Sequence, residues 1–362
     1  MTNTEHNTKP SILVTGGAGF IGGNFVLRQI QRGDTCIVNL DALTYAGHLA
    51  TLETIQNDPN HHFVLGSIND SKLIDYLLET HHPVAIINFA AESHVDRSID
   101  NPNAFLKTNV EGTFELLDSA LRYWNRLPSE QQQQFRFLHV STDEVYGSLG
   151  STGKFTEDNQ YRPNSPYSAS KAAADHFVRC YFKTYGLPTL TTNCSNNYGY
   201  YQFPEKLIPL MIHRAHNGQS LPIYGKGENV RDWLFVEDHC EALETVLKHG
   251  KPGQVYNVGG DNEMTNLELV NLLCGLLDDM LPDSPHAPHS NLIEFVTDRP
   301  GHDLRYAIDA SKIASELGWR PQHDFEQGLR KTVRWYLDNQ TWCDTVLADD
   351  YAGERLGIKQ PH

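Results

Sequence analysis

The chain has 362 residues, of which 39% are hydrophobic and 20% charged, and its formal net charge at pH 7 is −16. This length exceeds what one small core needs, so we expect a large domain with a smaller lobe. The acidic charge argues against a nucleic-acid partner, because phosphate binding requires a basic face. No apolar run approaches the length that spans a bilayer, which argues against a membrane partner.

The six cysteines are scattered, at positions 36, 180, 194, 240, 274 and 343, with no CxxC spacing. This pattern is typical of a reduced cytosolic protein and argues against a disulfide scaffold or a zinc site, so we expect no metal. Residues 1–10 are polar and lack the apolar segment of a signal peptide. We therefore expect a cytoplasmic protein with tails at residues 1–9 and 343–362.

The first elements predict a strand at residues 11–15, a glycine turn, and a helix continuing through Ile30. Strand, glycine turn and helix together form the context of a dinucleotide-binding loop, in which glycines allow close approach to a pyrophosphate. The spacing is GxxGxxG, formed by Gly16, Gly19 and Gly22. The alternative is a loop whose glycines only turn the chain.

A second strand is predicted at residues 35–40 and ends at Asp41, which is 19 residues beyond Gly22. An acidic residue at about this distance accepts hydrogen bonds from the adenosine ribose, and its charge repels a 2′-phosphate. Asp41 therefore favours NAD over NADP. The alternative is that Asp41 only caps the next turn.

Further strands and helices alternate through the first 200 residues and more loosely beyond them. We expect strands at 63–68, 84–89, 135–140, 187–193 and 255–258, the last returning to the main sheet. We expect helices at 71–78, 104–124, 167–185, 266–277, 308–317 and 325–339, and a surface loop at 128–134. The fold class is therefore α/β, a Rossmann-type doubly wound parallel sheet with a smaller mixed α/β C-terminal substrate lobe. We place the NAD-binding domain at 10–200 and the mainly substrate-binding lobe at 201–342.

Small and polar residues follow the predicted strands at residues 16–22, 41, 90–93, 142–144 and 196–197. Ligands of doubly wound sheets bind outside the carboxyl ends of the strands. We therefore expect these segments to meet at one site between the two lobes.

Tyr167 and Lys171 are four residues apart at the start of a predicted helix, so they share one face. The Lys171 ammonium and a positively charged nicotinamide ring favour the phenolate and are expected to lower the pKa of Tyr167. A phenol of that kind can take a proton from a substrate alcohol as hydride leaves its carbon, and Thr142 can bind the same oxygen. The alternative is a helix-capping tyrosine and a solvated lysine.

Asp143 and Glu144 follow the strand predicted at 135–140. Alcohol oxidation does not need them, whereas adjacent carboxyls suit proton abstraction next to a carbonyl with loss of a leaving group. The alternative is that one of them only pairs with an arginine or caps a turn.

The chain resembles the extended short-chain dehydrogenases/reductases that act on nucleotide sugars and, among them, the group of dTDP-glucose 4,6-dehydratases. The resemblance covers residues 11 to about 342 and rests on segments such as DALTYAG at 41–47, STDEVYG at 141–147 and SPYSASK at 165–171. Its most specific part is Thr142-Asp143-Glu144, since related epimerases tend to have small residues in place of the acids.

The resemblance implies that Tyr167 deprotonates the sugar 4-hydroxyl as C4 gives hydride to a tightly bound NAD. Glu144 then removes the C5 proton, Asp143 protonates the departing 6-hydroxyl so that water leaves, and hydride returns to C6 as C5 is reprotonated. The predicted catalytic residues are Thr142, Asp143, Glu144, Tyr167 and Lys171.

Binding residues carry over in the same way. Those expected to bind NAD are Gly16, Gly19, Phe20, Ile21, Gly22, Asp41, Thr44, Ser67, Ile68, Ala90, Ala91, Ser93, Thr108, Tyr167, Lys171 and Asn197. Those expected to bind the nucleotide sugar are Ser93, Thr142, Asn196, Lys206, Leu207, Pro222, Ile223, Tyr224, Arg231, Asn266, Arg299 and His302. Ser67, Tyr200 and Gln202 depart from the residues that the family usually has.

The family also forms homodimers, and the predicted helices at 104–124 and 167–185 could supply a four-helix bundle between subunits. The alternative is that both helices bury their apolar faces within their own domain. Two other functions remain open: another NAD-dependent sugar-nucleotide enzyme, such as an epimerase or decarboxylase, and a non-catalytic dinucleotide sensor. The preference for thymine over uracil depends on one methyl group, worth only about 1–3 kcal/mol.

Overall fold

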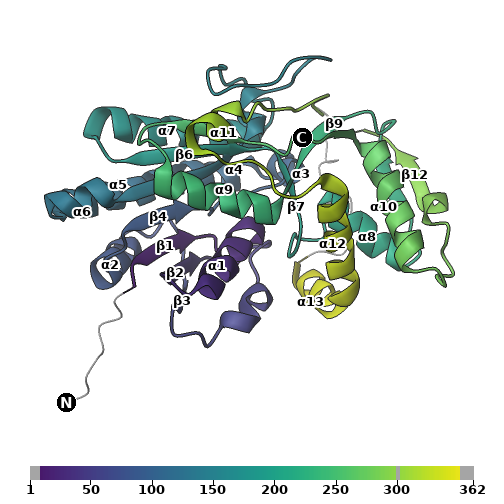
Figure 1. Cartoon of the computed structure of the whole chain (residues 1–362), viewed down its shortest axis with the longest axis horizontal. Helices are drawn as coiled ribbons and strands as arrows, with labels where there is room; N and C mark the ends of the chain where they lie inside the picture. Colours follow the sequence, from purple (N-terminus) through teal and green to yellow (C-terminus); the bar gives the residue numbers. More distant parts are fainter. Residues whose placement is uncertain (1–8, 299–301, 351–362) are drawn as a thin grey trace.

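The computed structural model describes residues 9–298 and 302–350. Its centre is a seven-stranded parallel sheet with the strand order β10-β6-β5-β4-β1-β2-β3 (Figure 1). The strands are β1 (Ser11–Thr15), β2 (Cys36–Asp41), β3 (His61–Leu65), β4 (Ala85–Asn88), β5 (Arg136–Thr142), β6 (Thr189–Cys194) and β10 (Val255–Val258). The predicted doubly wound sheet is confirmed, and so is the late strand, which pairs with β6. Because the order reverses between β1 and β4, a crevice opens there at the carboxyl ends.

Helices cover both faces of the sheet. On one face lie α1 (Phe20–Arg32) and α9 (Val236–His249), and on the other α2 (Ser71–His81), α5 (Thr113–Arg126) and α7 (Pro166–Tyr185). Successive residues of a strand point to opposite faces. Val14 therefore packs in the first core and Leu13 in the second.

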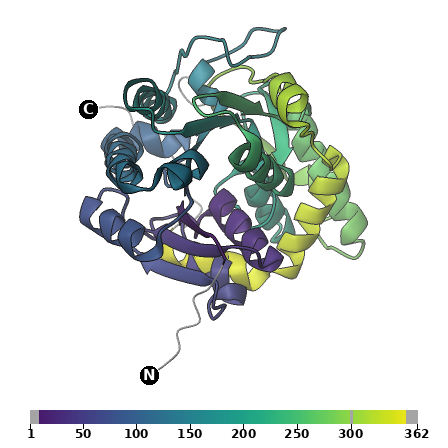
Figure 2. The same ribbon diagram turned by 60° about the vertical axis from the view of Figure 1, so that its left-hand side comes forward.

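The described part of the C-terminal lobe contains two small sheets and several helices. The sheets are β11-β9-β7 and β12-β8, from β7 (Asn196–Tyr198), β8 (Leu221–Tyr224), β9 (Val230–Phe235), β11 (Glu263–Thr265) and β12 (Ile293–Val296). The helices are α8 (Leu207–His216), α10 (Asn266–Met280), α12 (Phe325–Asp338) and α13 (Gln340–Asp350). The turned view in Figure 2 shows the yellow C-terminal helices beside the purple N-terminal segment, and α13 contacts the 3-10 turn η1 (Leu49–Ile55).

The structure differs from several local predictions. The expected loop at 128–134 contains helix α6 (Ser129–Gln134), which reciprocal hydrogen bonds between Trp124 and Gln132 attach to α5. The helix expected at 308–317 begins only at Ser311, as α11 (Ser311–Leu317), because Ile308 bridges to Phe155. The strand expected at 63–68 begins at His61 and ends at Leu65, so residues 66–68 belong to the connection that leads to α2.

The helix expected at 104–124 is not uniform. It consists of α4 (Pro102–Phe105), a π-helical segment η2 (Leu106–Gly112) and α5. Asn109 in the wide segment holds the backbone of Glu92: its Oδ1 accepts from the Glu92 N–H and its Nδ2 donates to the Glu92 carbonyl. Among the helices that the structure describes, none is both long and apolar enough to cross a membrane.

Candidate active site

Two cavities meet at the carboxyl ends of the central strands. The larger has a volume of about 480 Å³ and lies against the C-terminal lobe, and the smaller has about 350 Å³ and lies against the sheet. Five residues line both: Ser93, Glu144, Tyr167, Asn196 and Lys206. The predicted convergence of strand ends is therefore present, and the acid pair and the tyrosine lie at or beside the junction.

The smaller cavity is lined by every residue that the sequence predicts to contact NAD. Gly16 has φ +73°, and a Cβ there would lie 2.6 Å from the backbone nitrogen of Ala90, so only glycine fits this turn. Helix α1 begins directly after Gly19, whose position carries no side-chain cap. The N–H groups in the first turn of α1 can therefore bind an anion at the cavity, such as the pyrophosphate of a dinucleotide.

Asp41 caps the turn that follows β2, and it also lies at the cofactor cavity, where the sequence predicts it. Its carboxylate accepts hydrogen bonds from the backbone N–H groups of Ala18 and Leu43, both at 2.8 Å, which fastens the glycine turn to the end of β2. It also lines the smaller cavity. Burial raises its pKa, against the opposing effect of these two hydrogen bonds. A carboxylate has about four acceptor sites, so capacity for ribose hydroxyls remains.

Tyr167 and Lys171 lie on the same face of α7, but their contacts differ from the prediction. Lys171 is buried and its Nζ donates to the carbonyl of Val140 at 2.8 Å, while Tyr167 hydrogen-bonds to Thr142. The pKa of Tyr167 is raised well above its ordinary value, because burial and the charge of Glu144 disfavour the phenolate. The predicted lowering is therefore absent in the chain by itself, and a positive charge in the cavity would have to supply it.

The two acids occupy different environments. Glu144 lines both cavities, whereas Asp143 is 1% exposed and lies behind the cavity wall. Burial and the neighbouring Glu144 charge raise the pKa of Asp143 well above its ordinary value, against the opposing charge of Arg231. Within the described residues, its Oδ2 atom has no hydrogen-bond partner. This arrangement favours a protonated Asp143 beside a carboxylate that is open to the cavity.

The larger cavity collects the predicted sugar-nucleotide residues. It is lined by Ser93, Asn196, Lys206, Leu207, Pro222, Ile223, Tyr224, Arg231, Asn266 and His302. Thr142 lines only the smaller cavity, and Arg299 lies outside the described residues. Arg231 is held by the carbonyls of Val230 and Asp303 and lies 4.5 Å from the centre of the Tyr306 ring.

Arg97 and Glu205 also lie at the site, although the sequence predicts no role for either residue. The buried Glu205 lines the larger cavity and accepts a hydrogen bond from Arg97 Nε at 2.9 Å, and Arg97 lies 3.8 Å from the centre of the Tyr45 ring. Tyr45 belongs to the DALTYAG segment at 41–47, and Arg97 lies on α3 (Val95–Asp100). The pairing of Arg97 with Glu205 had no signal in the sequence, since 108 positions separate the two residues.

The three departures from the family pattern have different surroundings. Ser67 lines the smaller cavity and its hydroxyl donates to Asn69 Oδ1. Gln202 lines the same cavity and its amide donates to the carbonyl of Asn197 at 3.0 Å. Tyr200 packs instead against Trp335 and the core. Two of the three departures therefore face the proposed cofactor cavity.

The chain is similar to known proteins over most of its length. The sequence profile of a family described as GDP-mannose 4,6 dehydratase matches residues 13–332. The dTDP-glucose 4,6-dehydratase of Xanthomonas campestris pv. campestris (strain B100) is 61% identical over 345 residues, covering 95% of this chain and 98% of the relative. That of Neisseria meningitidis serogroup B is 54% identical over 349 residues, covering 96% and 98%. The chain belongs to the dTDP-glucose 4,6-dehydratase family.

Solved structures of this dehydratase family share the fold. A Bacillus anthracis dTDP-glucose 4,6-dehydratase in complex with NAD has a TM-score of 0.82 and 48% identity, covering 93% of this chain and 99% of that one. DesIV of Streptomyces venezuelae, with NAD and TYD bound, has a TM-score of 0.83 and 46% identity, covering 93% and 99%. A UDP-glucose 4-epimerase of Thermotoga maritima has a TM-score of 0.79 at 27% identity, covering 91% and 99%. Dehydratases and epimerases therefore share this backbone fold, and the side chains of the site have to distinguish the two activities.

Proposed function

We propose that this protein is an NAD-dependent hydro-lyase that converts dTDP-glucose to dTDP-4-keto-6-deoxyglucose. The observation that carries the proposal is the acid pair Asp143 and Glu144 beside Tyr167, where the two cavities meet. The family membership supports the same reaction. An epimerase has no need of two such acids, because it eliminates no water.

NAD is the cofactor that the smaller cavity fits. The tight turn at Gly16, the uncapped start of α1 and the carboxylate of Asp41 suit a pyrophosphate and a ribose without a 2′-phosphate. When bound, NAD supplies a hydride acceptor that is regenerated in each turnover. Its positive nicotinamide ring would oppose the effects that raise the pKa of Tyr167.

The chain's own groups then divide the proton transfers. Tyr167 takes the proton of the 4-hydroxyl, and Thr142 hydrogen-bonds to the same oxygen. Lys171 supplies a positive charge nearby. Glu144, open to both cavities, takes the C5 proton once C4 is a ketone. Asp143 gives its proton to the departing 6-hydroxyl, for which a raised pKa is the appropriate tuning.

We propose that the substrate lobe, residues 201–342, holds the nucleoside diphosphate, with Arg231, Arg299 and His302 toward the phosphates. The NAD-binding domain is then residues 10–200 with β10 returning to it. We also propose a cytoplasmic location. The six cysteines, which form no disulfide within the described residues, support it.

We further propose a homodimer through the outer faces of α5 and α7. Phe114 and Phe177 are 39% and 37% exposed, and their rings meet at 5.8 Å on that face. Tyr185 at the end of α7 is 53% exposed. Sedimentation velocity tests the proposal: Phe177→Glu is expected to give a monomer at concentrations where the wild type is a dimer, because a charge would be buried in the interface. A monomeric wild type would contradict it.

The function itself is tested by incubating the purified protein with dTDP-, UDP-, GDP- and CDP-glucose in parallel. Mass spectrometry and proton NMR should find a 4-keto-6-deoxy product, from dTDP-glucose above all, with no net NADH. Tyr167→Phe should reduce turnover by about 10²–10⁴-fold, the usual contribution of a general base. A product that keeps its 6-oxygen, or no product from NAD-loaded protein, would overturn the proposal.

A further inference from the structure

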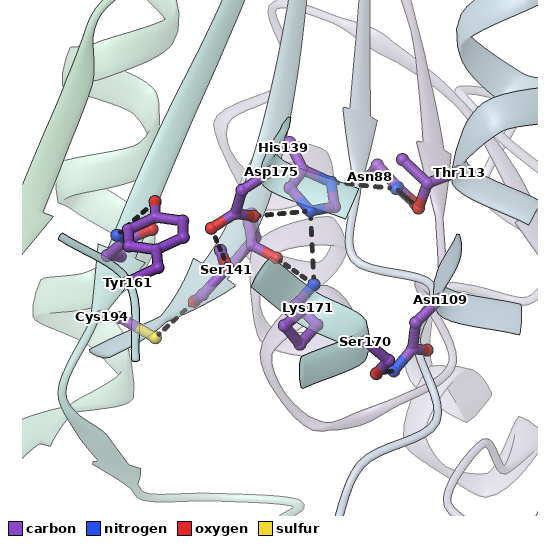
Figure 3. Close-up of polar contacts among 12 residues, drawn as sticks. Asn88, Asn109, Thr113, His139, Ser141, Tyr161, Ser170, Lys171, Asp175 and Cys194 are labelled. Atoms are coloured by element: carbon purple, nitrogen blue, oxygen red, sulfur yellow. Dashed lines mark hydrogen bonds and ion pairs between the residues drawn. The ribbon is translucent and has the colours of Figure 1, made fainter. Parts of the chain in front are cut away.

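A row of buried polar side chains lies beside Lys171, and of these only Ser141 also lines the smaller cavity. We refer to His139, Asp175, Asn88 and Ser141 as the His139 network. Figure 3 shows His139 at its centre, with Lys171 and Asp175 at one ring nitrogen and Asn88 at the other. All four members are at most 4% exposed, and the proposed reaction uses none of them directly.

The contacts of His139 define its chemical state. Asn88 Oδ1 accepts from the hydroxyl of Thr15 at 2.7 Å, which directs the Asn88 amide group to His139 Nδ1 at 3.1 Å. Nδ1 is then the acceptor, and in the neutral ring Nε2 carries the proton. Nε2 lies 3.4 Å from both Asp175 Oδ1 and Lys171 Nζ. Since burial and Lys171 lower the pKa of His139 to about 4, the ring is neutral near pH 7, and its Nε2 lies beside a carboxylate oxygen.

Asp175 follows Lys171 by one helical turn on α7, and its Oδ2 accepts from the Ser141 hydroxyl at 3.0 Å. Burial lowers the pKa of Lys171, while the charges of Asp175 and Cys194 raise it. The other titratable groups beside Asp175 are Tyr146 and Tyr161, whose pKa values are raised. Both phenols are therefore neutral near pH 7. A lysine buried this deeply loses its proton readily unless a carboxylate compensates its charge.

We propose that His139 and Asp175 are positioning residues for Lys171: the Asp175 carboxylate is the counter-charge of its ammonium group, and His139 fixes the two against strand β5. Through Lys171, this pair also affects the pKa of Tyr167. That effect matters only if Tyr167 is the base of the proposed function, whereas the charge state of Lys171 does not depend on the proposed function. A charged Lys171 beside the cofactor cavity disfavours NAD⁺ relative to NADH, because only the oxidised ring is positive.

The test is the ratio of the dissociation constants of NAD⁺ and NADH, measured by calorimetry across pH. As Lys171 loses its proton with rising pH, the NAD⁺ affinity should rise relative to that of NADH. Asp175→Asn should move the midpoint of this change to lower pH by about one unit or more, a tenfold change in the lysine equilibrium. Asp278→Asn is the matched control, because Asp278 bonds the buried His289 at 2.6 Å and neither residue lines a cavity. It should leave the midpoint unchanged.

Two variants of His139 separate positioning from mere packing. The amide of His139→Gln reaches the place of Nε2 and should keep the wild-type midpoint, whereas His139→Asn reaches only the place of Nδ1 and should lower it. A midpoint in Asp175→Asn equal to that of the wild type, or equal shifts in both His139 variants, would overturn the proposal. The affinities for NAD⁺ and NADH can be measured without catalysis. A failed dTDP-glucose assay would therefore overturn the proposed function but not the proposed roles of His139 and Asp175.

Discussion

At the scale of single residues, the site depends on unequal environments for neighbouring groups. Asp143 and Glu144 are adjacent in sequence, yet one is buried behind the wall and the other is open to both cavities. Burial favours the neutral form of a carboxyl, so the pair separates into an acid and a base without any difference in side-chain type beyond one methylene. The sequence predicted the pair, but the difference in exposure depends on the strands and loops that pack against it.

Replacing Asp143 by Asn should therefore stop water loss without stopping the steps before it. We expect dehydration to fall by about 10²-fold or more, while Glu144 still exchanges the C5 proton with solvent. The measurement is deuterium incorporation at C5 of recovered dTDP-glucose in D₂O, together with the rate of product formation. Glu144→Gln is the control, and it should lose the exchange as well. Dehydration by Asp143→Asn at the wild-type rate would show that another group is the acid.

At the scale of elements, the turn between β1 and α1 was predictable because its constraints are local. The glycine spacing and the flanking apolar runs determine a tight turn before a helix. The wide segment η2 was not predicted, since the pattern of residues 104–124 is also compatible with an ordinary helix. The contact of Asn109 with Glu92, which accompanies this segment, joins two elements and leaves no signal in either one alone.

Replacing two glycines of this turn by alanine should have different effects on stability. Gly16→Ala should lower the free energy of unfolding by about 1–3 kcal/mol and weaken NAD binding, because its φ is +73° and the Cβ meets the Ala90 backbone. At Gly19 the nearest atom to a Cβ is 3.4 Å away and φ is −83°, so Gly19→Ala should fold normally. Urea unfolding and NAD titration measure both effects. Equal stability of the two variants would contradict this account of the turn.

At the scale of the whole molecule, one hydrophobic core runs from a face of the main sheet into the C-terminal lobe. His239 lies within this region on α9, fully buried, with Nδ1 hydrogen-bonded to Asn197 Oδ1 at 2.8 Å. Burial lowers its pKa to about 3. Because the folded-state pKa lies below that of the unfolded chain, the unfolded chain binds the proton first as pH falls. This residue therefore removes stability between about pH 6.5 and pH 3.

Replacing His239 by Asn should reduce the loss of stability on acidification. Between about pH 6.5 and 4.5, the free energy of unfolding should fall by roughly 2–3 kcal/mol less in the variant than in the wild type, at about 1.4 kcal/mol per pH unit. Urea titrations at the two pH values give the comparison. His249→Asn, an exposed position on the same helix, is the control and should follow the wild type. The same acid response in all three proteins would rule out His239 as a cause.

The doubly wound sheet, the glycine turn, the acid pair and the family were predictable from the residues alone, because each depends on short segments whose residue types are specific. Which groups are buried beside which charges became known from the folded structure. It placed Asp143 behind the cavity wall, raised the pKa of Tyr167 instead of lowering it, and brought His139 and Asp175 to Lys171. The physical reason is that desolvation and Coulomb interactions depend on distance in space, and the chain sets those distances by packing segments that are far apart in sequence.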